Sequence, residues 1–147
     1  MKHKIYLASD HNGFDLKDQI KNYLDKNGFE TVDLGANNNK DLISYAKQGQ
    51  KLAQAVSKDK NSYGIGICGS GMGISYSVNR FKGIRGARIT SIEDAKLAKE
   101  RTNANVLLFG GRQIAINQAE AMLKEFFNSK FDENGILKTW TNELDEI

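Results

Sequence analysis

A single cysteine stands directly before a run of glycines, and this combination is the strongest chemical signal in the chain. Cys68 follows an apolar stretch, Tyr63 to Ile67. A glycine-rich turn between a strand and a helix leaves backbone N–H groups free to bind an anion. A thiolate beside such amides could remove a carbon-bound proton while the amides hold the oxygen that becomes negative. The candidate residues are Cys68, Gly69, Ser70, Gly71, Met72 and Gly73.

The same residues also have structural interpretations. A cysteine at the end of a strand is often a small core residue, and glycine-rich turns occur in α/β folds that bind no phosphate. The loop lacks the Lys-Ser/Thr pair of a P-loop, and Gly69, Gly71 and Gly73 do not have the spacing of a dinucleotide-binding turn. By itself, this stretch supports a catalytic role and a purely structural role equally.

A second polar group follows the first apolar run, residues 5–8. Asp10 could orient substrate hydroxyls, or it could cap the helix that follows. His11 could bind phosphate or polarise an oxygen, although a loop histidine is often merely exposed. Ser70 could assist the thiol, or serve as an ordinary turn residue. If the strands that end at Asp10 and Cys68 are neighbours, these side chains meet in one crevice at the carboxyl ends of a parallel sheet.

The elements that must position these groups follow from the hydrophobic periodicity. Apolar runs alternate with helical patterns five times, which predicts a mostly parallel sheet with helices on both faces. A last amphipathic helix is expected around Leu137, Trp140 and Leu144, and its apolar stripe could dock on its own core or on a second subunit. We expect strands at 5–8, 29–34, 63–67, 83–89 and 106–109, and helices at 14–24, 42–56, from 74, from 91 to about 102, and at 114–127.

Composition narrows the class of protein. The 147 residues predict one domain, 1–147, and 27% charged residues indicate a globular protein. The net charge is only +3 and the Lys and Arg residues are scattered, so the sequence does not predict a basic patch that would bind nucleic acid. One cysteine and two histidines are too few for a dedicated zinc site. The lone cysteine, the lack of a signal-peptide pattern and the lack of a membrane-length apolar run lead us to expect a cytoplasmic protein and no membrane partner.

Four motifs together resemble ribose-5-phosphate isomerase B and its relatives, the galactose-6-phosphate isomerase subunits. The resemblance runs nearly end to end. It implies a three-layer, Rossmann-like (flavodoxin-like) fold with five parallel strands, helices on both faces and a C-terminal helix. The motifs are Ser-Asp-His-Asn-Gly-Phe (9–14), Ile-Cys-Gly-Ser-Gly-Met-Gly-Ile-Ser (67–75), Val-Asn-Arg-Phe-Lys-Gly-Ile-Arg (78–85) and Asn-Ala-Asn-Val-Leu-Leu-Phe-Gly-Gly-Arg (103–112).

This resemblance implies a chemistry and an assembly. The family interconverts aldose and ketose phosphates through a cis-enediolate, without a metal or an organic cofactor. Carried over by position, Cys68 would be the proton-transferring base, and Ser70 with the glycines after it would hold the enediolate oxygen. Asp10 and His11 would contact the sugar phosphate. The family's sites lie between subunits, so a homodimer or homotetramer is expected.

The sequence departs from the family in the part of the site that a neighbouring subunit supplies. A histidine and an asparagine that open the sugar ring are replaced by Arg101 and Thr102. Two phosphate-binding arginines near the C-terminus are replaced by Gly135 and Thr139, although Lys138 could substitute as a point charge. An arginine stabilises an anion but does not shuttle a proton near neutral pH.

Three hypotheses therefore stand beside one another. The chain is a ribose-5-phosphate isomerase with altered ring-opening and phosphate groups. Alternatively, it is the cysteine-bearing subunit of a hetero-oligomeric galactose-6-phosphate isomerase whose other subunit supplies the missing groups. In the third hypothesis it is a sugar-phosphate-binding paralogue without catalytic activity.

Overall fold

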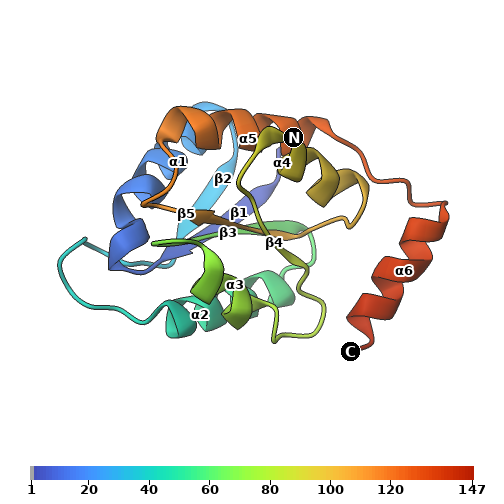
Figure 1. The fold of residues 1–147 in the computed structure, drawn as a ribbon, viewed down its shortest axis with the longest axis horizontal. Coiled ribbons are helices and arrows are strands. Elements are labelled where there is room, and N and C mark those ends of the chain that lie inside the picture. Colours follow the sequence, from blue (N-terminus) through green and yellow to red (C-terminus); the bar gives the residue numbers. More distant parts are fainter. Residues whose placement is uncertain (1) are drawn as a thin grey trace.

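A computed structural model describes residues 2–147 and contains one five-stranded sheet between two layers of helices (Figure 1). The expected alternation of strands and helices is confirmed, and every strand pairing in the sheet is parallel. The strands are β1 (Lys4–Ser9), β2 (Glu30–Asp33), β3 (Ser62–Cys68), β4 (Gly86–Arg88) and β5 (Val106–Gly110).

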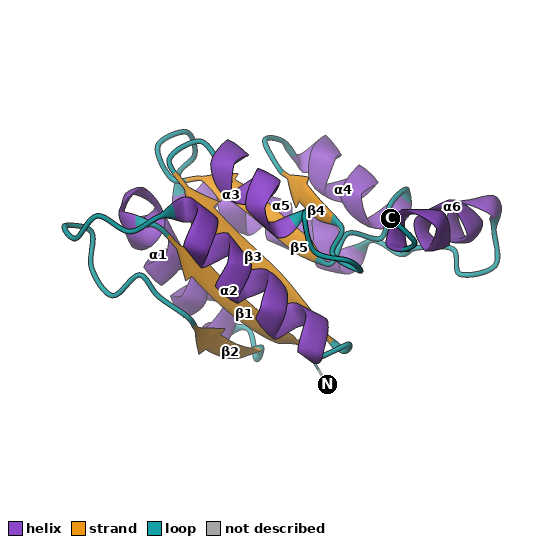
Figure 2. Cartoon of the chain, turned by 90° about the horizontal axis from the view of Figure 1, so that it is seen from below, coloured by secondary structure: helices purple, strands orange, loops and turns teal. Residues whose placement is uncertain are grey.

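The helices cover both faces of this sheet, as predicted. In Figure 1, α1, α4 and α5 lie above it and α2 and α3 below it, and Figure 2 shows α2 and α3 from their own side. The helices are the short 3₁₀ turn η1 (His11–Gly13), α1 (Phe14–Lys26), α2 (Tyr45–Lys58), α3 (Met72–Val78), α4 (Ile92–Glu100), α5 (Ile116–Asn128) and α6 (Ile136–Asp145).

The strand order β2-β1-β3-β5-β4 makes β1 and β3 neighbours, which is the condition that the predicted site required. From β1 the chain passes outward to β2 and then returns to the other side of β1 to form β3, so the order reverses between β1 and β3. Ser9 pairs in register with Ile67, and the last residues of both strands therefore end side by side. Ligands of open α/β sheets bind at such a reversal point.

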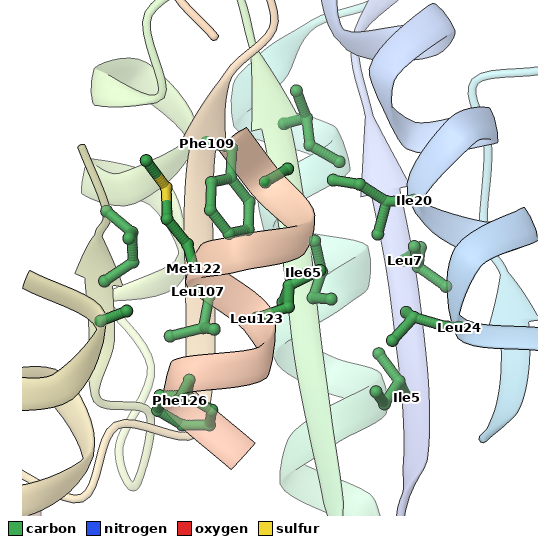
Figure 3. Close-up of a cluster of buried hydrophobic side chains, with 14 of the residues drawn as sticks. Ile5, Leu7, Ile20, Leu24, Ile65, Leu107, Phe109, Met122, Leu123 and Phe126 are labelled. Carbon is green, nitrogen blue, oxygen red and sulfur yellow. The ribbon is translucent and has the colours of Figure 1, made fainter. Parts of the chain in front are cut away.

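Alternating apolar residues of the inner strands form the core against α1 and α5. In Figure 3, Met122, Leu123 and Phe126 of α5 lie over Ile65 of β3 and Leu107 of β5. Side chains of a strand alternate between the two faces of the sheet, so the residues between these point to α2 and α3.

On the second face β3 presents glycines, which brings α2 close to the sheet. A Cβ on Gly64 would lie 2.9 Å from the Val56 Cγ2 of α2, and one on Gly66 would lie 3.0 Å from the Leu52 Cδ2 of the same helix. Cys68 continues this face and packs in the apolar cluster that includes Leu52 and Ile74. The orientation of Cys68 toward α2 and α3 is therefore set by the alternation of β3.

Several predicted boundaries were wrong, among them the starts of α2, α3 and α5, the extent of β4 and the end of α4. Helix α2 begins at Tyr45 rather than at residue 42, because the Ser44 hydroxyl accepts hydrogen bonds from the amides of Ala46 and Lys47 at 3.1 and 3.2 Å. Strand β4 is shorter than the expected 83–89, since only Gly86–Arg88 pair with β5. Helix α4 ends at Glu100, two residues before the expected end.

Helix α6 stands apart from the layered body, joined to it by residues 129–135 (Figure 1). Its Asp145 carboxylate accepts a hydrogen bond from Arg85 Nη1 at 2.9 Å. Ile136 and Trp140 remain 61% and 52% exposed, so much of the predicted apolar stripe has no partner in this chain. Among residues 2–147, no helix is both long and apolar enough to span a membrane.

Candidate active site at the ends of β1 and β3

Asp10 lies directly beside the end of β3. Its amide donates to the carbonyl of Ile67 at 3.2 Å, so it is held next to the residue that precedes Cys68. Its side chain is buried and accepts a hydrogen bond from the Gly13 amide at 3.0 Å. Asp10 thus caps the short turn η1, which carries His11, rather than the predicted helix itself, because the N-cap of α1 is Gly13.

Glycines allow the loops after β1, β3 and β5 to touch. A Cβ on Gly13 would overlap the carbonyl oxygen of Ile67, and one on Gly111 would lie 2.7 Å from the carbonyl oxygen of Asn12. The amide of Gly111 donates to the carbonyl of Cys68 at 2.8 Å. These backbone contacts leave no room for side chains, so the three loops form one packed unit.

Cys68 ends β3 at the base of this unit. It is a free thiol and only 3% exposed. The residue is nevertheless next to the surface, since Gly69 and Ser70 directly after it are half-buried. In the single chain the thiol is thus buried, directly beneath two half-buried residues of the loop.

The glycine loop turns sharply into α3. Gly71 adopts φ +80°, a conformation that glycine takes without steric cost. The Ser70 hydroxyl accepts from the Met72 amide at 3.2 Å. Within the described part of the chain, the amides of Gly69, Ser70 and Gly71 make no backbone or side-chain hydrogen bond. Three donors next to Cys68 thus remain available for an oxygen of a ligand.

His11 and Tyr45 border the same loops. The imidazole Nδ1 of His11 accepts a hydrogen bond from the Ile43 amide at 3.2 Å. The ring of Tyr45 lies over Gly73, where an added Cβ would be 2.5 Å from the Tyr45 Cε1. Ile43, before α2, and Tyr45, its first residue, therefore lie along one side of the candidate site.

Two arginines beside the glycine loop were not among the predicted site residues. Arg112 follows β5, donates through its amide to the Gly69 carbonyl at 3.0 Å and through Nη2 to Asn12 Oδ1 at 2.8 Å. Arg88 Nε donates to the Ser70 carbonyl at 2.9 Å. The signal for Arg112 was present in the sequence, because a Gly-Gly-Arg run directly follows a strand whose carboxyl end faces the same edge.

The remaining predicted residues are not brought to this edge by their own chain. Arg101 follows α4 and Thr102 donates its hydroxyl to the Ala98 carbonyl at 2.9 Å, so both precede β5 at the opposite edge of the sheet. Lys138 lies on α6, with Nζ 3.3 Å from the Glu133 carboxylate. One chain thus assembles Asp10, His11 and the Cys68 loop, but not the other three residues.

The described residues do not form a metal-binding site. Among residues 2–147, no group of three or more His, Cys, Asp or Glu side chains is arranged to hold a metal ion.

A cavity of about 740 Å³ lies at the amino ends of the strands, where its lining includes Ser62, Arg85 and Asp145. That cavity is at the edge opposite Cys68.

Comparison with known proteins identifies the family. The model of the Ribose/Galactose Isomerase family matches residues 5–143, nearly the whole chain. The chain belongs to this isomerase family. The resemblance stated from the four sequence motifs is thereby confirmed.

The relatives similar to this chain include proteins named for ribose 5-phosphate and proteins named for galactose 6-phosphate. A probable ribose-5-phosphate isomerase B of Mycoplasma pneumoniae is 34% identical over 90% of this chain and 87% of its own length. The galactose-6-phosphate isomerase subunit LacB of Clostridium acetobutylicum is 35% identical over 86% of this chain and 73% of its own length. The crystal structure of a ribose 5-phosphate isomerase from Thermotoga maritima covers 100% of both chains with a TM-score of 0.94 and 34% identity, which confirms the predicted fold.

Proposed function

We propose that this protein interconverts ribose 5-phosphate and ribulose 5-phosphate, with Cys68 as the base. The observation that carries the proposal is the juxtaposition of Cys68 and Asp10 at the reversal point of the sheet, beneath amides without partners. Membership of the isomerase family and a relative named for this reaction support the substrate class.

The proposed reaction moves one proton between adjacent carbons. The Cys68 thiolate takes the proton from C2 of the open-chain aldose, and the electron pair of that C–H bond forms the C1–C2 double bond. The C1 carbonyl oxygen becomes the enediolate oxygen and accepts hydrogen bonds from the loop amides. The thiol then returns the proton to C1 while the O2 hydroxyl loses its proton to O1, which gives the ketose.

The other groups at this edge have binding roles in the proposal. Asp10 accepts a hydrogen bond from a sugar hydroxyl, and His11 donates to an oxygen of the substrate. Arg112 provides a cation beside the glycine loop, and a guanidinium binds phosphate through two parallel hydrogen bonds. Met72 and Gly73 form the rim of the loop, next to Tyr45.

We infer that a second copy of the chain completes the site. Arg101 and Thr102 lie at the opposite edge of their own sheet, and Lys138 lies on α6. All three are at least partly exposed, so they are available to a neighbouring protomer. The apolar residues of α6 that remain exposed, Ile136 and Trp140, suit burial against such a protomer. The assembly is a homodimer or a homotetramer.

Solvent exchange tests the chemistry directly. Purified chain is incubated with ribose 5-phosphate in D₂O, and the sugar is analysed by proton NMR. Proton transfer through an enediolate predicts ribulose 5-phosphate that carries deuterium at C1, since the thiol equilibrates with solvent. Ketose without any deuterium would contradict an exchangeable base, and the absence of ketose would remove the proposed substrate.

A galactose-6-phosphate isomerase subunit is the second candidate. The likeness to the subunit LacB and the replacement of the ring-opening residues by Arg101 and Thr102 favour it. In that case the isolated chain is inactive on galactose 6-phosphate and becomes active when a related subunit with the histidine is added. Binding of both sugar phosphates without turnover under either condition would instead favour a paralogue without catalytic activity.

A further inference from the structure

The segment between β2 and α2, residues 34–44, is fixed at both ends beside the candidate site. Its first residues extend the end of β1, since the Ser9 amide donates to the Gly35 carbonyl at 2.7 Å and the Ala36 amide donates to the Ser9 carbonyl at 3.0 Å. Ser9 directly precedes Asp10. The position of this segment is therefore coupled to the position of the site carboxylate.

A fully buried lysine holds the start of the segment. Lys17 of α1 is 0% exposed, and its Nζ lies 2.6 Å from Asp33 Oδ1 and 2.9 Å from the Ala36 carbonyl oxygen. Asp33 Oδ1 also accepts from the Gly35 amide at 2.9 Å. A charged lysine is rarely buried unless its donors are satisfied. Its ammonium thus joins helix α1, the end of β2 and the start of the segment at one point.

The end of the segment contacts His11. The Ile43 amide donates to His11 Nδ1, so this nitrogen must carry a lone pair rather than a proton. In a neutral imidazole the proton then resides on Nε2. Protonation of Nδ1 would replace the acceptor with a second donor and would break the contact with Ile43.

We propose that residues 34–44 select the tautomer of the His11 imidazole that carries its proton on Nε2, so that this nitrogen donates one hydrogen bond to an anionic oxygen of the ligand. Lys17 is the positioning residue that holds the segment in the place from which Ile43 reaches the ring. The role of His11 toward a sugar phosphate rests on the proposed function, whereas the position of its proton does not.

The tautomer is measured on the free protein by nitrogen-15 NMR of the imidazole rings at mildly alkaline pH. A His3→Gln variant leaves His11 as the one histidine and removes the overlap of signals. The expected result is an unprotonated Nδ1 and a protonated Nε2. A proton on Nδ1, or rapid exchange between both tautomers as in a free imidazole, would overturn the proposal.

Removal of the Ile43 N–H tests whether this hydrogen bond determines the tautomer of His11. Ile43→Pro deletes the N–H that bonds to His11, and its matched control is Leu42→Pro, whose amide has no hydrogen-bond partner among residues 2–147. We expect mixed tautomers and a KM raised about tenfold in Ile43→Pro, the loss of one hydrogen bond to a charged group, with kcat nearly unchanged. A fixed Nε2–H tautomer in Ile43→Pro would overturn the role of the segment.

Lys17→Met tests the remote anchor, and Lys21→Met on the same helix is its control, since Lys21 pairs with Asp25 on the surface at 2.8 Å. Lys17→Met should raise the KM severalfold and mix the tautomers, and Lys21→Met should do neither. If Lys17→Met does not fold, Asp33→Asn weakens the same link without emptying buried space. An unchanged tautomer and KM in the folded variant would show that Lys17 only stabilises the fold.

Titration with inorganic phosphate separates this inference from the proposed function. If the chain has no isomerase activity, the tautomer and the response of the Nε2–H signal to phosphate remain measurable. A shift of that signal in the wild type that is lost in Ile43→Pro supports the inference by itself. No shift, together with a fixed tautomer and active enzyme, would assign His11 to another contact and overturn its role as the anion donor.

Discussion

Asp10 is buried, bonded to the Gly13 amide and packed at the carboxyl ends of the strands, whereas Arg101 stands exposed at the other edge of the same sheet. The first edge is built by backbone contacts between three loops, so its geometry exists in the single chain. The second edge holds its polar groups on the surface, where only another molecule could give them a fixed position. Substitutions at the first edge should therefore change stability or chemistry, and those at the second should change binding.

Cys68→Ala gives the largest expected effect at the first edge. Loss of the base should lower kcat by roughly a hundredfold to ten-thousandfold, the usual contribution of general base catalysis. The KM and the binding of phosphate should change little, because the loop amides and Arg112 remain. Steady-state kinetics with ribose 5-phosphate measures both constants. Turnover that survives the substitution would remove Cys68 from the mechanism.

Gly13→Ala should break the packing of the first edge. A Cβ at this position overlaps the Ile67 carbonyl, and backbone atoms cannot move aside cheaply, so we expect a loss of about 1–3 kcal/mol in the free energy of unfolding. Gly69→Ala is the control, because its Cβ would be 3.6 Å from the nearest atom, Arg112 Cδ. Urea denaturation should show a loss for Gly13→Ala alone. Equal stability of both variants would mean that the loops are not packed as described.

Arg101→Ala tests the second edge. The exposed side chain should leave stability unchanged and raise the KM about tenfold, the cost of a lost charged hydrogen bond. At substrate concentrations well below the KM, Arg101→Ala alone should keep about a tenth of the wild-type rate and Cys68→Ala almost none. An equimolar mixture of the two chains forms hybrid dimers with one intact site, so its rate should rise to about a quarter of the wild-type value if the sites are shared. Mixtures no more active than their components would place all catalytic groups within one chain.

Ser9→Ala gives the smallest expected effect. The Ser9 hydroxyl is buried and has no hydrogen-bond partner in the part of the chain that the structure describes. Removal of an unsatisfied polar group should leave the free energy of unfolding unchanged or raise it by up to about 1 kcal/mol. Thermal unfolding measures this change. A marked loss of stability would show that the hydroxyl has a partner, such as a bound water.

The sequence predicted the elements well where a local pattern determines them. Asp10 as a cap and Cys68 at the end of a strand both follow from neighbouring residues. The burial of Lys17 could not be predicted, because a lysine in an amphipathic helix is expected on the exposed face. Its partner Asp33 lies 16 residues away in the sequence. The Ser44 cap was readable from its residue type, but the apolar Leu42 and Ile43 favoured an earlier start of α2. The bond from Ile43 to His11 depends on two loops meeting in space, and no local pattern encodes that.

The order of the strands has a consequence for how the chain is made. Strand β4 pairs with β5 alone, and β5 lies between β4 and β3. During synthesis, residues 86–88 therefore have no sheet partner until residues 106–110 have left the ribosome. In a nascent chain that stalls between residues 88 and 106, we expect β1, β2 and β3 to pair with one another. Strand β4 and helix α4 then have no place in the sheet until β5 is made.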